Sequence, residues 1–360
     1  MGTKRWGARR RLLVGAGVAG GVGLGAAYRF ALQYRARVGR PHRHAVEGSP
    51  ADFGLAFESV EIPSGSLRLS GWFVPLEGGR VGPGVVVVHG WESNRGRSLA
   101  HVRYLHAAGF HCLVLDVRGH GDSPADDLPI NVPEFAHDTI AAVRWLADRS
   151  YITCIGVLGH SMGGAGTIVA ASREPLVSAV VSMSAPADLV YMTRKTFDLA
   201  EMRIPEPIAT PLAWFTAAML LAPRHHSLED ASARVAAARY RGPLLLIHGA
   251  QDHGVPVQHL DLIAQAASEQ RGENEAEVET LVLPEFGHRW LYEETACRRA
   301  VADFFARSLG GLAPEDAAER AAAVVVSRPD DPVYGFGALA SKAPPSPSRA
   351  EPLAVEQSED

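Results

Sequence analysis

The sequence predicts an α/β fold built on a mostly parallel sheet, and three observations support this prediction. Short, continuous apolar segments alternate with amphipathic helical patterns over residues 84–159. The same alternation returns at residues 244–248 and 278–283, each followed by a helical pattern. Apolar residues make up 47% of the chain and charged residues 21%, which is ordinary for a globular protein. Apolar strands alternating with helices are typical of a parallel sheet with both faces covered by helices.

The elements can be assigned in chain order. Residues 56–62 and 67–74 are rich in β-forming residues, and Pro63-Ser64-Gly65-Ser66 between them predicts a hairpin. A helix–strand alternation then follows, in which strands are expected at residues 84–89, 110–116, 153–159 and 179–184, and helices at residues 103–108 and 133–148.

The chain length favours one main domain with two tails. Its 360 residues exceed what one small core needs and fall short of two large domains. We expect a main domain at residues 50–309, preceded by a leader at residues 1–49. Residues 185–241 have a helical pattern interrupted by prolines and predict an insertion into the main domain. This insertion forms either a cap over the sheet edge or a pair of surface helices, and the cap is favoured. Residues 310–360 are rich in Ala, Pro and Ser, and we expect a disordered tail.

The leader has the order of a signal or anchor segment. Lys4, Arg5 and Arg9 to Arg11 precede sixteen uncharged residues at positions 12–27, of which six are Gly. That stretch is short and Gly-rich for a membrane-spanning helix, which needs about 20 apolar residues. A membrane anchor, a cleaved export signal of the twin-arginine type and a disordered basic leader therefore all remain open. Residues 1–45 predict association with the membrane or export to the cell envelope, with a cytoplasmic location as the alternative.

The charge distribution argues against nucleic acid as a partner. The first 46 residues hold ten Lys or Arg and no Asp or Glu, so the net charge of −5 leaves −15 for the rest. Phosphate binding needs clustered basic residues on the folded surface, and the body of the chain has none in its sequence. Its three cysteines are odd in number and widely spaced, which disfavours a disulfide framework or a zinc site.

The strongest chemical signal is Gly159-His160-Ser161-Met162-Gly163-Gly164, which fits the Gly-x-Ser-x-Gly pattern. It stands after an apolar strand and before a helix. A sharp turn there would hold the serine in strained backbone geometry, with its hydroxyl clear of the sheet, provided that glycines flank it. We therefore expect Ser161 to be a nucleophile; a Gly-rich turn with a chance serine is the alternative.

A serine nucleophile needs a base and a group that orients the base. Asp252 and His288 each follow a predicted strand, in the chain order serine, aspartate, histidine. The carboxyl ends of parallel strands share one sheet edge, so we expect the three side chains to meet there. His288 is then the general base and Asp252 its orienting carboxylate. Asp188, after the strand at residues 179–184, is the rival acid, with helix capping as its alternative role.

The anionic intermediate of acyl transfer needs hydrogen-bond donors aimed at its oxygen. His89-Gly90-Trp91 ends a predicted strand, and the glycine would let the next amide turn inward. We assign this oxyanion hole to the backbone N–H groups of Trp91 and Met162.

Together with Asp116-Val117-Arg118-Gly119-His120-Gly121-Asp122-Ser123, these motifs resemble the α/β-hydrolase superfamily, and more narrowly its serine aminopeptidase and monoacylglycerol-lipase-like branch. Residues 50–55 and 71–75 are similar to bacterial members of that branch that often carry an N-terminal membrane anchor. The resemblance covers about residues 50–309. It implies a central sheet of about eight strands and no metal or organic cofactor, and we expect Arg118 and Asp122 to serve the scaffold.

The expected function is that of a serine esterase acting on a small-molecule acyl substrate. A peptidase or thioesterase of the same fold is the alternative, because one fold hosts many chemistries. A binding or scaffold protein that keeps the fold is the non-enzymatic alternative. Residues 212–221 are apolar almost all round, so we expect them either to be buried in the cap or to line the substrate site.

Overall fold

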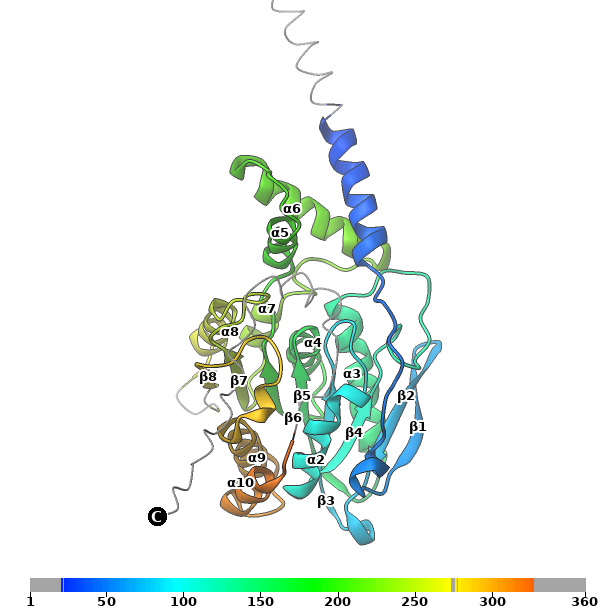
Figure 1. The fold of residues 1–360 in the computed structure, drawn as a ribbon, viewed down its shortest axis with the longest axis vertical. Coiled ribbons are helices and arrows are strands. Elements are labelled where there is room, and N and C mark those ends of the chain that lie inside the picture. Colours follow the sequence, from blue (N-terminus) through cyan, green and yellow to red (C-terminus); the bar gives the residue numbers. More distant parts are fainter. Residues whose placement is uncertain (1–20, 22, 273–275, 277, 327–360) are drawn as a thin grey trace, which may run out of the picture.

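In the computed structural model, residues 21, 23–272, 276 and 278–326 are described (Figure 1). Within them, eight strands form one sheet. In chain order these are β1 (Glu58–Ser64), β2 (Leu67–Val74), β3 (Gly82–Val88), β4 (His111–Leu115), β5 (Ile152–His160), β6 (Val177–Met183), β7 (Leu244–Gly249) and β8 (Val278–Leu283). The order across the sheet is β1-β2-β4-β3-β5-β6-β7-β8, antiparallel where β2 meets β1 and β4 and parallel elsewhere.

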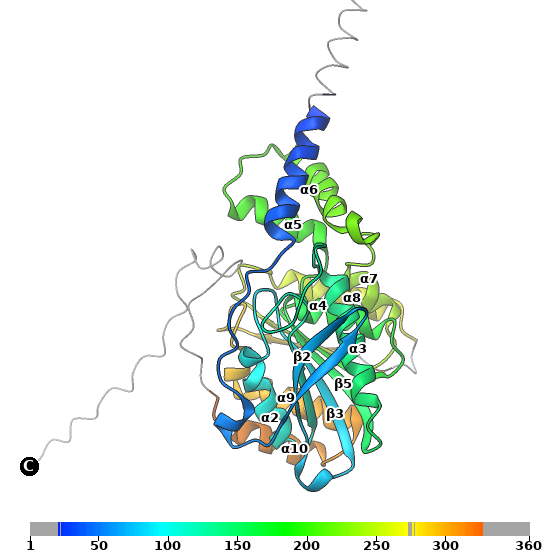
Figure 2. The same cartoon turned by 90° about the vertical axis from the view of Figure 1, so that its right-hand side faces the viewer.

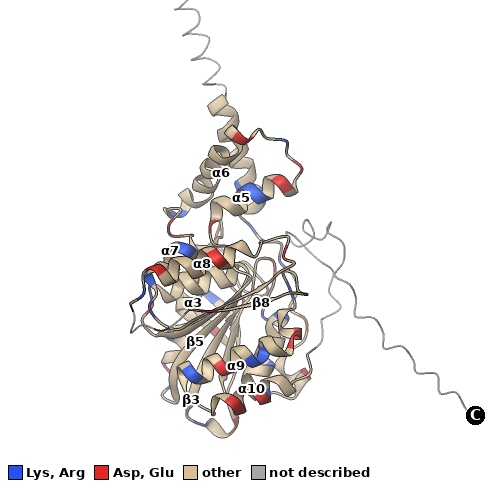
Figure 3. Cartoon of the chain, turned by 90° about the vertical axis from the view of Figure 1, so that its left-hand side faces the viewer, with Lys and Arg blue, Asp and Glu red and all other residues tan. Residues whose placement is uncertain are grey.

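Helices cover both faces of the sheet, which confirms the predicted fold class. One face carries α3 (Val132–Ala147), α4 (Met162–Ala171), α7 (Ala233–Arg239) and α8 (Gln258–Glu269). The other face carries α2 (Leu99–Ala107), α9 (Thr295–Leu309) and α10 (Pro314–Ala323). Charged side chains of both signs are interspersed along α9 and α10, whereas those of α8 are all acidic (Figure 3).

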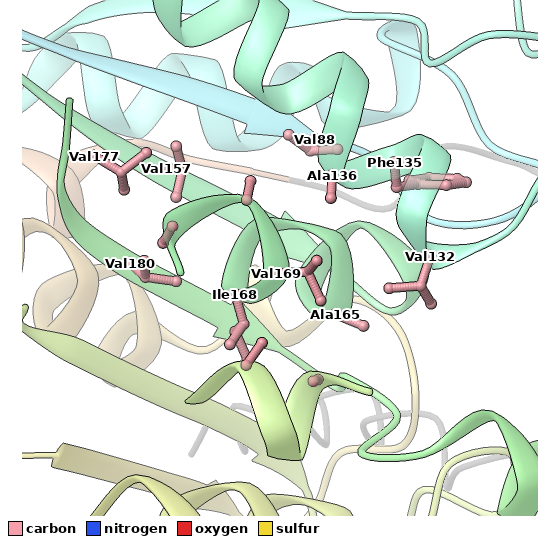
Figure 4. Packing of buried hydrophobic residues seen from close by; sticks show 14 of the residues in the cluster. Val88, Val132, Phe135, Ala136, Val157, Ala165, Ile168, Val169, Val177 and Val180 are labelled. Carbon is pink, nitrogen blue, oxygen red and sulfur yellow. The ribbon is translucent and has the colours of Figure 1, made fainter. Parts of the chain in front are cut away.

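The central strands are buried on both sides, which explains their continuous apolar sequence. In β3, Val86 and Val88 belong to one core cluster while Val85 and Val87 belong to the other, because successive strand residues point to opposite faces. The helix α4 is fully embedded: Figure 4 shows its residues beside α3 and the sheet, with Ala165, Ile168 and Val169 among Phe135, Ala136, Val157 and Val180. Burial of each large aliphatic side chain contributes roughly 1.5–3 kcal/mol to the free energy of folding. This packing therefore holds α4 in place against α3 and the sheet.

Three helices stand together beyond the body of the domain, and we call them the lid (Figures 1 and 2). They are α5 (Leu189–Leu199), α6 (Glu206–Leu221) and the N-terminal helix, residues 23–38. The expected cap at residues 185–241 is narrower in the structure. Its last part, α7, packs against the sheet domain, because Ala233, Ala236 and Ala237 belong to the same core cluster as α3 and α4.

Two boundary expectations are corrected by the structure. Residues 23–38 are not outside the domain, because Ala31 is fully buried and Phe30 packs edge-on against Phe197 of α5. Residues 314–323, expected to be disordered, form α10. Pro314 lies in its first turn, and the Ala317, Ala318 and Ala321 side chains are small enough for close contact with α9. Alanine is a strong helix former, so an Ala-rich segment folds once a neighbouring helix covers it.

The anchor hypothesis concerns residues that the structure mostly does not describe. Residues 12–20 and 22 of the apolar stretch lie outside the described part, as do residues 327–360 of the expected tail. Among the helices that are described, none combines the length and the hydrophobicity needed to cross a bilayer.

Candidate active site

Ser161 lies at the turn between β5 and α4, as its motif predicts. Its backbone has φ 56° and ψ −121°, a left-handed conformation that non-glycine residues rarely adopt. The Ser161 amide donates a hydrogen bond to the Met183 carbonyl at 2.8 Å, which ties the turn to β6. Such strain costs roughly 1–3 kcal/mol and persists only where the surroundings enforce it, which is common at functional sites.

The glycines of the motif allow the chain to approach itself closely. A Cβ atom on Gly159 would lie 2.3 Å from the Gly163 carbonyl oxygen. One on Gly163 would lie 2.3 Å from the carbonyl oxygen of His89, in the turn that follows β3. A side chain at Gly159 would therefore distort the turn around Ser161, residues 159–163, which we call the elbow. A side chain at Gly163 would push the elbow away from the turn that holds Trp91.

The structure brings together the three residues that the sequence selects. The Ser161 Oγ and His288 Nε2 atoms are 2.9 Å apart, and His288 Nδ1 lies 2.6 Å from Asp252 Oδ2. Asp252 follows β7 and His288 follows β8, so both project from the same sheet edge as the elbow. A carboxylate can only accept, so His288 Nδ1–H donates to Asp252, and Nε2 is then the acceptor for the Ser161 hydroxyl.

Asp252 is held as a carboxylate. It is buried, and its Oδ1 accepts hydrogen bonds from the amides of Gly254 at 2.9 Å and Val255 at 2.8 Å. Burial alone would raise the pKa of Asp252. The charge of His288 and hydrogen bonds from His248 and His288 outweigh burial and hold that pKa well below its ordinary value.

The rival acid, Asp188, is directed elsewhere. Its Oδ1 accepts a hydrogen bond from the Ser232 hydroxyl at 2.7 Å, and its Oδ2 lies 3.2 Å from Arg234 Nε. Asp188 occupies the N-cap position of α5, but its side chain makes no capping hydrogen bond there. The side chain therefore fastens the start of α5 to the start of α7.

The two expected oxyanion donors lie beside Ser161 in one cavity. Met162 is the first residue of α4, and Trp91 follows the glycine at the end of β3. Neither backbone N–H has an acceptor among the described residues, so both are available to an incoming oxygen. The N-terminus of α4 also presents a partial positive charge at this position.

His160 is a site residue that the sequence did not single out. Its Nε2–H donates a hydrogen bond to the backbone carbonyl of His288 at 2.7 Å. Burial, reinforced by the neighbouring His288, lowers the pKa of His160 to about 3, so its ring is neutral at physiological pH. No pattern could have marked this contact, because the partner is a backbone atom 128 positions away.

The Asp116–Ser123 motif serves the scaffold in the structure. Arg118 donates from its side chain to Asp138 of α3, and the Asp116 carboxylate accepts from the Arg95 and Asp122 amides at 2.6 and 2.9 Å. Neither Arg118 nor Asp122 is among the described residues that line the cavity above Ser161.

That cavity has a volume of about 550 Å³ and extends from Ser161 and His288 to the lid. Near Ser161 it is lined by His288, Trp91 and Met162, and at the lid by residues of all three helices. Of the apolar stretch at residues 212–221, only Leu220 lines it, while Trp214 is 56% exposed. No group of three or more His, Cys, Asp or Glu in the described part of the chain is placed to hold a metal ion.

Two family profiles match the chain. Residues 81–197 match the family described as "Serine aminopeptidase, S33", and residues 140–291 match "BAAT / Acyl-CoA thioester hydrolase C terminal". An uncharacterised protein of Mycobacterium tuberculosis is 29% identical over 231 residues, which are 64% of this chain and 70% of the relative. The sn-1-specific diacylglycerol lipase ABHD11 of Xenopus laevis is 33% identical over 130 residues, which are 35% of this chain and 40% of the lipase.

Solved structures support the same fold. The Pyrococcus furiosus esterase Pf2001 superposes with a TM-score of 0.60 at 24% identity and covers 75% of this chain and 97% of the esterase. The fold, the two profiles and the sequence relatives agree with one another. The chain therefore belongs to the α/β-hydrolase superfamily.

Proposed function

We propose that this protein is a serine hydrolase that cleaves carboxylic esters through an acyl-enzyme intermediate. The observation that carries the proposal is the continuous hydrogen-bonded series from Ser161 through His288 to Asp252, with contacts of 2.9 and 2.6 Å. A serine hydroxyl is a weak nucleophile by itself, and this arrangement supplies the base that activates it.

In the proposed reaction, His288 Nε2 takes the proton of Ser161 as its Oγ attacks the substrate carbonyl. The resulting oxyanion accepts hydrogen bonds from the Trp91 and Met162 amides, each of which is worth roughly 3–4 kcal/mol of transition-state stabilisation. The protonated His288 then gives its proton to the leaving alcohol, so that the C–O bond breaks and an acyl-serine remains. Water, deprotonated by the same imidazole, releases the acid and restores Ser161.

Asp252 has an orienting role in this scheme. Its carboxylate fixes the His288 tautomer with the proton on Nδ1 and stabilises the imidazolium that forms transiently. The low pKa of Asp252 supports this role, because the carboxylate keeps its negative charge throughout the reaction.

Thioesters are the second candidate substrates, since residues 140–291 match an acyl-CoA thioester hydrolase family. Amides are the third, because residues 81–197 match a family described as aminopeptidases. Esters are favoured because an amine is a harder leaving group than an alcohol, and because a diacylglycerol lipase and an esterase stand among the similar proteins. A non-catalytic binding role is disfavoured by the complete series of three residues.

A matched substrate panel tests this ranking. Wild-type protein is assayed with a p-nitrophenyl ester, a thioester and an anilide that share one acyl group. The proposal expects kcat/KM to be highest for the ester and lowest for the anilide. Faster cleavage of the anilide than of every ester would replace the esterase proposal with a peptidase.

We also propose, from the sequence of residues 1–45, that the chain associates with a membrane or is exported to the cell envelope. Fractionation of cells that express the native full-length protein tests this proposal. Recovery entirely in the cytosol would contradict both the anchor and the export hypotheses.

A further inference from the structure

The N-terminal helix is packed into the lid through a cluster of aromatic side chains. The Phe30 and Tyr34 rings lie 5.5 and 6.0 Å from the Phe197 ring of α5, both in edge-on geometry. Edge-on contacts between aromatic rings are favourable beyond the area they bury. Ala31, on the same helix, has no exposed surface. The N-terminal helix is therefore an integral part of the lid.

The segment after this helix fastens it to the elements of the active site. The Gly39 carbonyl accepts a hydrogen bond from the Ile130 amide at 2.9 Å. The His42 amide donates to Glu92 Oε1 at 3.1 Å, and Asn94 Nδ2 donates to the Ala45 carbonyl at 3.0 Å. Glu92 and Asn94 belong to the same turn as Trp91, the proposed oxyanion donor. These hydrogen bonds therefore fix the segment after the N-terminal helix relative to that turn.

The N-terminal helix also forms a wall of the cavity above Ser161. Tyr34 and Val38 line this cavity together with Leu189 and Met192 of α5 and Leu220 of α6. The lining at this end combines these apolar side chains with Arg37 and Thr193. Thr196 also lines it, but its hydroxyl donates to the Met192 carbonyl of its own helix at 2.9 Å. The lid helix α6 carries no charged side chain after Glu206, as Figure 3 shows.

We propose that Tyr34, Val38, Leu189, Met192 and Leu220 form a binding subsite for an aliphatic chain of the substrate, with the N-terminal helix as its outer wall. This inference rests on the proposed function, because the chain belongs to an ester whose carbonyl lies at Ser161. We assign chain-length specificity to Val38, because its side chain is half-buried and lines the cavity from the N-terminal helix.

The size of the effect follows from the hydrophobic contribution of a methylene group. Each methylene that enters an apolar subsite raises kcat/KM about fourfold until the subsite is full. Val38→Ala enlarges the subsite, so the preferred chain becomes longer. Val38→Trp fills it, so kcat/KM for a decanoate ester falls at least tenfold while that for an acetate ester changes less than about twofold.

Two ester series identify which part of the substrate occupies the subsite. In one, p-nitrophenyl esters vary from acetate to palmitate; in the other, acetate esters vary in the length of the alcohol. In each series, kcat/KM is measured as a function of chain length. The series in which this dependence shifts in the Val38 variants identifies whether the acyl or the alcohol chain occupies the subsite. Leu24→Ala is the matched control, because Leu24 lies on the same helix but is 74% exposed. It should leave both profiles unchanged.

A binding measurement separates this inference from the proposed function. Calorimetry with decanoate and the Ser161→Ala protein requires no turnover. The inference expects binding that Val38→Trp weakens at least tenfold and Leu24→Ala does not. A wild-type protein that cleaves no ester would refute the proposed function, and calorimetry would still decide on the subsite. Folded Val38 variants with unchanged profiles and unchanged decanoate binding would refute the subsite itself.

Discussion

The Nε2 atom of His160 lies 2.7 Å from the carbonyl oxygen of His288, so the residue before Ser161 supports the backbone of His288. The two rings are also neighbours, with centroids 5.0 Å apart. This contact links the end of β5, directly before Ser161, to the loop after β8, which carries His288. We therefore expect it to help position His288 relative to Ser161.

His160→Ala should lower kcat about tenfold with little change in KM, because the loop that carries His288 loses a buried hydrogen bond worth roughly 1–3 kcal/mol. His160→Gln, whose amide can still donate, should recover part of that loss. Steady-state kinetics on one ester measure both effects. Equal kcat values in wild type and His160→Ala would mean that this hydrogen bond does not position the base.

Asp252→Asn should reduce kcat about ten-thousand-fold, because His288 then adopts the wrong tautomer. The matched control is Asp188→Asn, which alters a carboxylate that binds Ser232 and Arg234 instead. Its effect on kcat should stay within a few-fold. The opposite ranking of the two variants would transfer the acid role to Asp188.

The dependence of kcat/KM on pH should show a single-proton acid limb. The proposed reaction needs one neutral imidazole to accept the Ser161 proton, so a single protonation is enough to stop it. The pKa of Asp252 is held well below its ordinary value, so this carboxylate stays ionised over the same range. A limb with a slope of two, or a flat profile down to pH 4, would contradict this assignment.

Acidification should also destabilise the folded protein. Burial lowers the pKa of His89 to about 4, and burial with the nearby His89 lowers that of His120 to about 3. Both groups therefore bind protons more tightly in the unfolded chain. Their contribution to stability is complete above about pH 6.5, the ordinary histidine value, and is lost progressively as the pH falls toward 4. Calorimetric Tm values should decline from pH 7 to pH 5; a constant or rising Tm would count against this account.

The sheet and the elbow could be predicted because their signals are local. Continuous valine runs such as β3 identify buried strands, and Gly159 and Gly163 allow a turn in which Cβ atoms would collide. The position of Ser161, Asp252 and His288 after the parallel strands β5, β7 and β8 then predicts that their side chains meet. The distances between them depend on the fold as a whole, and only the structure provides these.

The sequence predicts a cap at residues 185–241, but not that residues 23–38 join it or that residues 314–323 form a helix, because these contacts are distant in sequence. Residues 23–38 resemble part of a leader until Phe30 and Tyr34 are placed against Phe197. The stretch at residues 212–221 resembles a cavity wall, yet only Leu220 lines the cavity. The alanines of α10 suggest disorder in isolation, and the neighbouring α9 supplies the contact that orders them.

Reaction of the protein with a fluorophosphonate probe, followed by identification of the modified residue, tests the central claim most directly. The account predicts modification of Ser161, with both labelling and ester hydrolysis abolished in Ser161→Ala and turnover reduced about a million-fold. A Ser161→Ala protein that folds and keeps near wild-type activity would contradict it.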